Sequence, residues 1–230
     1  MPTSRVILVL YAFIATTNVM ASATGNDSLF WATKPLLMPL LVAMVLFAGP
    51  AVWGVRASRW LVAGLVAATV GDVLLMIDGL FYPGVGAFAL CHVAYLVAFA
   101  RAGVWRRLSR WPQLLVPVLY AAVLIAGAAM LRPGAALIGY GLLLALMATG
   151  AAGLNWRSGL GGALFLVSDL LIGIGLDGTE RPVAVMLTYV LGQGLIVLGW
   201  LHHFERPRAA IPRPRAAVAD ASSDQEIRAE

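Results

Sequence analysis

The sequence carries little charge, one lysine and one cysteine. Asp, Glu, Lys and Arg together make up 12% of the 230 residues, about half the share of a soluble domain. Such a composition excludes a disordered chain and a nucleic-acid binder built on a basic face, because both depend on many exposed charges. With Cys91 as the single cysteine, an intramolecular disulfide and a cysteine-based zinc site are excluded as well.

The sequence contains several long apolar runs with few charged residues. Hydrophobic residues make up 61% of the chain, and a helix needs about 20 apolar residues to cross a membrane. We find eight such runs and predict an all-α membrane protein, an eight-transmembrane-helix bundle within residues 1–205. The predicted spans, numbered in chain order, are about 4–23, 35–53, 60–79, 84–100, 113–131, 134–152, 158–176 and 182–203. Residues 206–230 combine three prolines with mixed charges and are predicted to be a disordered cytoplasmic tail.

The basic residues predict the orientation, because cytoplasmic loops are enriched in Lys and Arg. With both the N- and C-termini in the cytoplasm, thirteen of the sixteen basic residues lie on the inner side, and Lys34, Arg132 and Arg181 lie on the outer side. The use of Arg in place of Lys indicates a GC-rich bacterial genome, so we expect a multi-pass protein of the cell (inner) membrane. Span 1 also has the features of a signal peptide that ends at Ala21-Ser22-Ala23, and its cleavage stays an alternative.

A weak internal repeat relates the two halves of the chain. The stretch from Gly71 to Leu75, with Asp72, matches the stretch from Ser168 to Ile172, with Asp169, at an offset of 97 residues. The same offset takes His92 in span 4 to Tyr189 in span 8. Two sets of four spans in the same orientation predict a 4+4 parallel repeat about an axis along the membrane normal. Coincidence between apolar helices is the alternative.

The polar residues inside the spans gather at one depth. Asp72 and Asp169 lie 12 and 11 residues from the inner ends of their spans, or roughly 17 Å. Because ionisable groups at such depth are costly, we expect them to face the bundle interior. The candidate site residues at this depth are Asp72, Asp169, His92, Tyr95, Ser168, Tyr189 and Gln193. The other tyrosines of the spans, Tyr11, Tyr120 and Tyr140, are interpreted as packing or interfacial residues.

Two carboxyl groups in one dry cavity suit acid–base chemistry. They do not both ionise readily, so we expect one to hold a proton while the other stays ionised. Such a pair can hydrolyse a bond through an oxocarbenium-like cation, as glycosidases do. His92, Tyr95 and Tyr189 would orient these groups or donate hydrogen bonds, and Lys34, predicted at the start of span 2, would pair with a carboxylate or a lipid phosphate. Aspartates that only hold helices together are the structural alternative.

These motifs resemble the YhhN-like family of membrane proteins, which includes the lysoplasmalogenases (alkenylglycerophospholipid hydrolases). The resemblance extends over most of the chain, from span 2 to span 8. It is carried by Lys34-Pro35, by Gly71 to Met76, by Phe81, Gly84, Phe88, His92, Tyr95 and Phe99, by Gly162 to Phe165 with Ser168-Asp169, and by Tyr189 with Gln193, Leu195 and Ile196.

The resemblance implies a hydrolase that acts on ether bonds. Its substrate would be a lysoplasmalogen, a 1-alkenyl-glycerophosphocholine or -ethanolamine, and its products a fatty aldehyde and the glycerophospho head group. Asp72 and Asp169 would be the catalytic acid and base, in an order left open, and the supporting residues would be His92, Tyr95, Ser168, Tyr189, Gln193 and Lys34. The expected partners are a lysophospholipid and membrane lipid. No metal, other cofactor or nucleic acid is expected, and the oligomeric state is left open.

A proton-coupled transporter or lipid-binding protein is the main alternative, since carriers also place carboxylates near the midplane of repeated bundles. Carriers break helices with Gly or Pro beside the site, whereas the prolines here lie at span ends, apart from Pro39 and Pro117 near the beginnings of spans 2 and 5. An intramembrane aspartyl protease has less support, because its Gly-x-Gly-Asp pattern is replaced by Thr69-Val70-Gly71-Asp72. The residues therefore favour the hydrolase.

Overall fold

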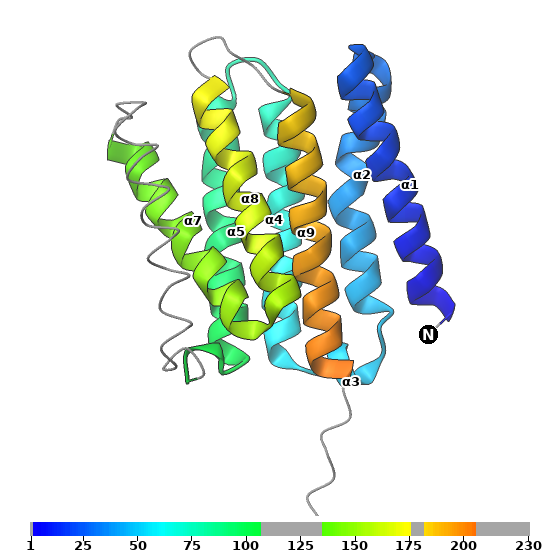
Figure 1. The fold of residues 1–230 in the computed structure, drawn as a ribbon, viewed down its shortest axis with the longest axis vertical. Helices are drawn as coiled ribbons and strands as arrows, with labels where there is room; N and C mark the ends of the chain where they lie inside the picture. Colours follow the sequence, from blue (N-terminus) through cyan, green and yellow to red (C-terminus); the bar gives the residue numbers. More distant parts are fainter. Residues whose placement is uncertain (1, 107–134, 176–181, 206–230) are drawn as a thin grey trace, which may run out of the picture.

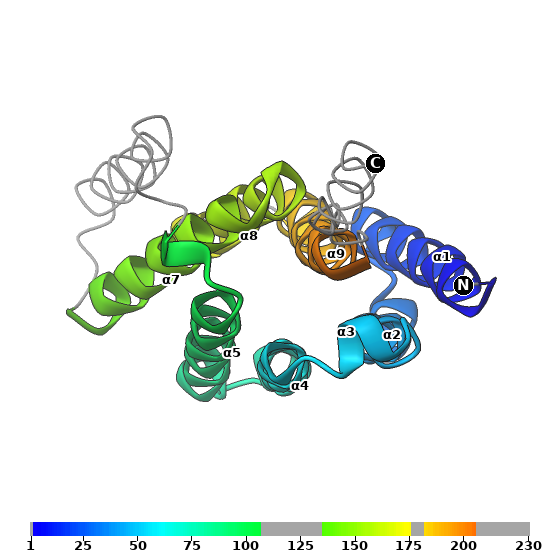
Figure 2. The ribbon, with the colours of Figure 1, turned by 90° about the horizontal axis from the view of Figure 1, so that it is seen from below.

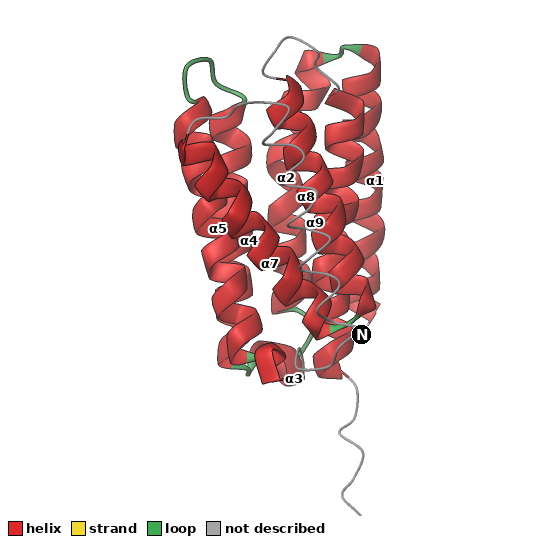
Figure 3. Ribbon diagram, turned by 60° about the vertical axis from the view of Figure 1, so that its left-hand side comes forward, coloured by secondary structure: helices red, strands yellow, loops and turns green. Residues whose placement is uncertain are grey.

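The computed structural model describes residues 2–106, 135–175 and 182–205, and within these ranges it contains helices and connections but no strand (Figures 1 and 3). The helices are α1 (Pro2–Thr24), α2 (Asp27–Leu46), α3 (Pro50–Trp53), α4 (Arg56–Leu75), α5 (Phe81–Arg101), the 3-10 helix η1 (Val104–Arg106), α7 (Ala135–Leu154), α8 (Trp156–Gly175) and α9 (Pro182–Glu205). The predicted all-α class is confirmed for this part of the chain. The predicted fifth span and the predicted tail lie outside the described residues.

The helices have the length and surface of membrane spans. Within the described ranges, α1, α2, α4, α5 and α9 are long and apolar enough to cross a membrane, and Ile138–Leu154 of α7 is a shorter apolar helix. Large apolar side chains such as Val9, Phe13 and Leu90 are exposed on the outer faces. Such surfaces contact acyl chains in a bilayer and would be a liability in water. The chain is a multi-pass membrane protein.

Helix α2 begins earlier than the sequence predicts. The prediction for span 2 was 35–53, because proline favours the first turn of a helix and Pro35 opens an apolar run. Instead, the side chain of Asn26 caps the helix by accepting a hydrogen bond from a backbone N–H of the first turn, and the last residues of the prediction form the separate helix α3. Lys34 therefore lies inside the helix, seven residues from Asp27, or about 10 Å along the axis.

Six of the described helices form a closed ring (Figure 2). Going round it, α2 contacts α4, then α5, α7, α8 and α9 follow in turn, and α9 contacts α2 again. Helix α1 lies outside the ring against α2 and α9, where the Tyr11 hydroxyl donates a 2.6 Å hydrogen bond to the carbonyl of Val190. The order α2, α4, α5 corresponds to spans 2, 3 and 4, and the order α7, α8, α9 to spans 6, 7 and 8. The 4+4 repeat would produce this arrangement, and the repeat itself stays a prediction.

The two ends of the bundle differ in charge. The start of α1 and the end of α9 lie at the same end (Figure 1), which we call the arginine end. The described arginines lie there or in the adjoining helix turns: Arg5, Arg56, Arg59, Arg101, Arg106 and Arg157. Asp27 and Asp78 lie at the opposite end. The arginine end is the end predicted to face the cytoplasm, and this orientation stays a prediction.

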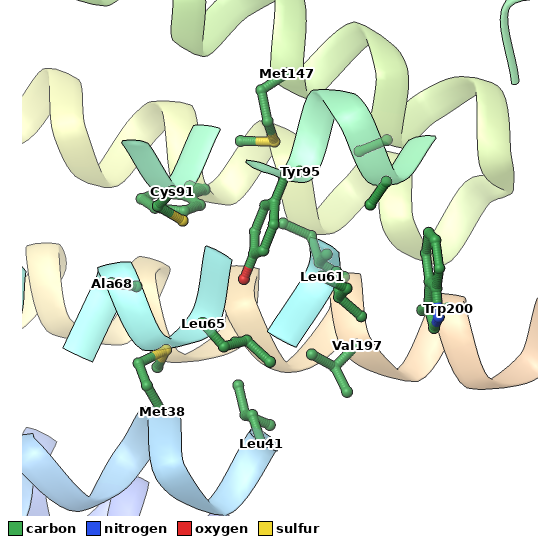
Figure 4. Close-up of a cluster of buried hydrophobic side chains, with 14 of the residues drawn as sticks. Met38, Leu41, Leu61, Leu65, Ala68, Cys91, Tyr95, Met147, Val197 and Trp200 are labelled. Atoms are coloured by element: carbon green, nitrogen blue, oxygen red, sulfur yellow. The ribbon is translucent and has the colours of Figure 1, made fainter. Parts of the chain in front are cut away.

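Apolar side chains fill the ring toward the arginine end. Figure 4 shows Leu61 of α4 close to Val197 of α9, with Leu65 and Trp200 in the same cluster, and all four are buried. The Trp200 indole N–H donates a 3.0 Å hydrogen bond to the Ser58 hydroxyl, which ties α9 to α4. The carboxylates of Asp72 and Asp169 lie nearer the opposite end of the ring.

Candidate functional site

Asp72 is held between α2, α4 and α9. It lies three residues before the end of α4 and is 2% exposed. The Tyr189 hydroxyl on α9 donates a 2.7 Å hydrogen bond to Asp72 Oδ2, and Lys34 Nζ on α2 lies 3.8 Å from Asp72 Oδ1. A fixed positive charge thus faces this carboxylate away from water. We call Lys34, Asp72 and Tyr189 the lysine half-site.

Asp169 is held between α5, α7 and α8. The Tyr140 hydroxyl on α7 donates a hydrogen bond to Asp169 Oδ2. His92 Nε2 on α5 lies 3.0 Å from Tyr140 Oη and 3.7 Å from Asp169 Oδ2. We call His92, Tyr140 and Asp169 the histidine half-site.

The interpretation of Tyr140 as a packing residue is wrong, because its phenol bridges an imidazole and a carboxylate. Depth along the helix is the signal that would have found it. Tyr140 lies five residues from the start of α7 and Tyr189 seven from the start of α9, so both are about 8 to 10 Å from the same end of the bundle. Of the other tyrosines interpreted as packing residues, Tyr11 joins α1 to α9, and Tyr120 lies outside the described residues.

Phe165 on α8 links the two half-sites. Its ring lies 5.0 Å from the His92 ring and 5.5 Å from the Tyr189 ring, measured between centroids, and meets both edge to face. The Phe88 ring packs against both Phe165 and Tyr189. Because aromatic faces stabilise cations, this cluster suits a reaction that passes through a positively charged carbon.

Three predicted supporting residues bond elsewhere. The Tyr95 hydroxyl donates a 2.7 Å hydrogen bond to Gln193 Oε1, and the Ser168 hydroxyl donates a 3.1 Å bond to the carbonyl of Val185. The structure therefore brings five of the eight predicted residues into the two half-sites: Lys34, Asp72, His92, Asp169 and Tyr189.

Two buried nitrogen atoms near the half-sites, His92 Nδ1 and Gln193 Nε2, have no hydrogen-bond partner within the described part of the chain. Buried polar atoms of this kind are costly unless a water or a ligand meets them. The site therefore has two places where a polar atom from outside the protein would be stabilised.

A groove between α1 and α9 lies away from the aspartates. It has a volume of about 360 Å³ between α1 and α9 and is lined almost wholly by apolar side chains, among them Leu8, Ala15, Leu191 and Leu198. One chamber shared by the two carboxylates stays a prediction. Within residues 2–106, 135–175 and 182–205, no three His, Cys, Asp or Glu side chains lie close enough together to hold a metal ion.

The contacts cross between the two halves of the chain. At the offset of 97 residues, position 72 corresponds to position 169, and position 92 to position 189. Asp72 of the first half contacts Tyr189 of the second, and Asp169 of the second half lies beside His92 of the first. Each half-site is therefore built from both halves.

Comparison with known proteins identifies the family. The chain matches the YhhN family over residues 29–200. It belongs to this family. The YhhN protein described here is also 32% identical over 168 residues to lysoplasmalogenase TMEM86B of Sus scrofa, across 70% of this chain and 71% of that protein. No solved structure matches it. The region matched by the family contains every residue of both half-sites, which confirms the resemblance seen in the sequence.

Proposed function

We propose that this YhhN protein is a lysoplasmalogenase that cleaves the vinyl ether of a 1-alkenyl lysophospholipid within the membrane. The observation that carries the proposal is the pair of aspartates inside the bundle, Asp72 buried and Asp169 partly buried, each hydrogen-bonded to a tyrosine and each beside a basic side chain. A relative named as a lysoplasmalogenase supports the substrate class. Vinyl ethers hydrolyse through protonation at carbon, which needs a buried acid and a group that stabilises the resulting cation.

The half-sites differ in a way that assigns one aspartate as the acid and the other as the base. Lys34 gives Asp72 a fixed cation, and Tyr189 donates to the same carboxylate, so both favour its ionised form. Within the described residues, Asp169 forms no ion pair with a lysine or arginine, and its basic neighbour is the imidazole of His92, a side chain that can pass a proton on. We therefore assign Asp72 as the base and Asp169 as the acid.

The proposed reaction consumes one water. Asp169 gives its proton to the vinyl carbon farther from the ether oxygen, and the double-bond electrons form the new C–H bond, leaving an oxocarbenium ion. Asp72 takes a proton from water while the water oxygen bonds to the cation, which gives a hemiacetal. The hemiacetal loses its C–O bond as its hydroxyl proton passes through water to the leaving oxygen, releasing the aldehyde and the glycerophospho head group. Asp72 then releases one proton and Asp169 regains one.

Proton-coupled lipid transport is the second candidate, and one observation favours it. Pro35 and Pro39 both lie inside α2, one and five residues after Lys34, whereas the sequence analysis placed Pro35 at a span end. A helix with prolines beside a buried charged pair is a feature of carriers. A transporter would move the lipid without releasing aldehyde, so the two candidates are separated by their products.

The proposed function is tested with purified protein in lipid vesicles and a 1-alkenyl lysophospholipid, by measuring aldehyde release. We expect Asp72→Asn and Asp169→Asn each to lower the rate by at least about 100-fold, because each removes one proton-transfer group. Asp78→Asn, at an exposed aspartate, is the matched control and should keep the wild-type rate. Near-wild-type rates in either site variant would overturn the assignment, and lipid movement without aldehyde would favour the transporter.

A further inference from the structure

We propose that His92 and Tyr140 form a proton relay that returns a proton to Asp169, and that the proton enters at His92 Nδ1. The relay rests on the proposed function, since it supplies the proton that Asp169 loses to the substrate. It gives Tyr140, which is not among the residues that carry the family resemblance in the sequence, a positioning and proton-transfer role in that reaction.

The geometry makes Tyr140 the route between the imidazole and the carboxylate. His92 Nε2 and Asp169 Oδ2 are 3.7 Å apart, which is too long for a direct hydrogen bond. Tyr140 Oη is hydrogen-bonded to both of these atoms, at 3.0 Å from His92 Nε2. A hydroxyl donates one proton and accepts others, so this phenol can accept from one neighbour while it donates to the other.

The transfer conserves protons overall and moves the imidazole proton from Nε2 to Nδ1, so proton exchange with water restores the Nε2–H tautomer, and the Tyr140 hydroxyl turns back to Asp169, before the next turnover. A proton from water bonds to His92 Nδ1, the Nε2 proton passes to Tyr140 Oη, and the original phenol proton passes to Asp169 Oδ2. Afterwards His92 is neutral with its proton on Nδ1, Tyr140 is again a phenol that donates to Nε2, and Asp169 is a carboxylic acid. The water becomes hydroxide, which is neutralised by the proton that Asp72 releases in the same cycle.

His92 Nδ1 is suited to be the entry point. The side chain is buried, and Nδ1 has no hydrogen-bond partner among the described residues. The ring is held in place by Phe165 at 5.0 Å and by Tyr140 at 5.4 Å between centroids. A fixed ring with one nitrogen bonded to Tyr140 and the other unpaired leaves a position for one water molecule.

The lysine half-site offers no comparable relay. Asp72 accepts from Tyr189, and its basic neighbour is the ammonium of Lys34, which holds a fixed charge instead of passing a proton to the phenol. Among the described residues, Cys91 on α5 and Asp72 are the further ionisable groups that interact electrostatically with Tyr140 or Asp169. The two half-sites thus share an aspartate bonded to a tyrosine, but the lysine half-site holds a constant charge and the histidine half-site can transfer a proton.

The relay is tested without substrate by following protonation of Asp169 after a rapid drop in pH, using the infrared C=O stretch that Asp169→Asn removes. We expect Tyr140→Phe and His92→Gln to slow the appearance of this band by about 100-fold, because each interrupts the relay at a different member. Tyr82→Phe, at an exposed tyrosine, is the control and should match the wild type. An unchanged rate in either relay variant that folds would overturn the proposal.

A second measurement uses turnover. With Asp169 protonated beforehand, Tyr140→Phe should release about one aldehyde per protein at nearly the wild-type rate and then slow by about 100-fold, with KM unchanged. Equal loss in the first and later turnovers would overturn the relay, because it would indicate a merely structural effect. A wild-type protein that releases no aldehyde would overturn the proposed function instead, and the infrared measurement would still decide on the relay.

Discussion

At the scale of single residues, the ion pair of Lys34 and Asp72 is the feature with the largest consequence for stability. Both side chains are almost fully buried, and their charged atoms are 3.8 Å apart. A buried pair of this kind adds little net stability, but removal of one partner leaves an uncompensated charge in a low-dielectric environment. The pair is better understood as a device that keeps Asp72 ionised.

Removal of the lysine charge should therefore destabilise the protein strongly. We expect Lys34→Met to lower the free energy of unfolding by about 3 kcal/mol, measured by denaturant unfolding in detergent micelles. The double variant with Asp72→Asn should regain most of this loss, because no charge is then left unpaired. Arg59→Met, at an exposed site, is the control. A double variant no more stable than Lys34→Met would contradict the explanation.

At the scale of elements, the close approach of α8 and α9 positions the aromatic cluster. A Cβ atom added at Gly161 would lie 2.6 Å from the carbonyl oxygen of Gly192 and 2.7 Å from the backbone nitrogen of Ile196. These are backbone atoms, so the two helices would have to move apart. Small residues at such crossings let membrane helices pack backbone to backbone. The crossing places Phe165 against Tyr189.

A side chain at this crossing should disturb both packing and catalysis. We expect Gly161→Ala to lower the melting temperature in detergent and to reduce aldehyde release, since Phe165 and Tyr189 would separate. Gly86→Ala is the matched control, because no atom lies within 4 Å of its added Cβ, and it should be neutral or stabilising by up to about 1 kcal/mol. Equal melting temperatures for the two variants would show that the contact has no role in stability.

At the scale of the whole molecule, the charge difference between the two ends predicts how the protein lies in the membrane. The six described arginines gather at one end, and Asp27 and Asp78 lie at the other. Asp72 lies three residues from the helix end near Asp78. With the arginine end in the cytoplasm, the proposed reaction would take place in the outer half of the bilayer.

Labelling of single cysteines would test this orientation. In spheroplasts, a membrane-impermeant maleimide should react with Asp78→Cys directly and with Arg56→Cys only after permeabilisation, since both sites are exposed at opposite ends. Cys91 is buried and should contribute little background. The reverse pattern of labelling would mean that the positive-inside rule fails for this protein.

The sequence predicts where the helices lie along the chain better than it predicts which helices pack together. Apolar length alone places the helices, because a bilayer demands about 20 apolar residues and intrahelical hydrogen bonds. The start of α2 is mispredicted because Asn26 and Pro35 both signal a helix start, and tertiary structure decides between them. Lys34 consequently lies deeper than expected, where it meets Asp72.

The site residues, like the helices, were predicted only in part from the sequence. Asp72, Asp169 and His92 are found from the sequence because charged or ionisable groups are rare inside spans. Tyr140 is not found from the sequence, because a tyrosine in an apolar helix can have many roles. Its role here depends on Asp169, which lies 29 residues further along on the neighbouring helix. Which helices are neighbours is a property of the ring, and periodicity along a single helix does not encode it.

The crossing of contacts between the two halves has a consequence for how the chain can be divided. A cut after Arg106 would leave Lys34, Asp72 and His92 on one fragment and Tyr140, Asp169 and Tyr189 on the other. The first fragment would carry Asp72 without Tyr189, and the second would carry Asp169 without His92. Such fragments would be inert alone and would become active only by complementing one another in the same bilayer.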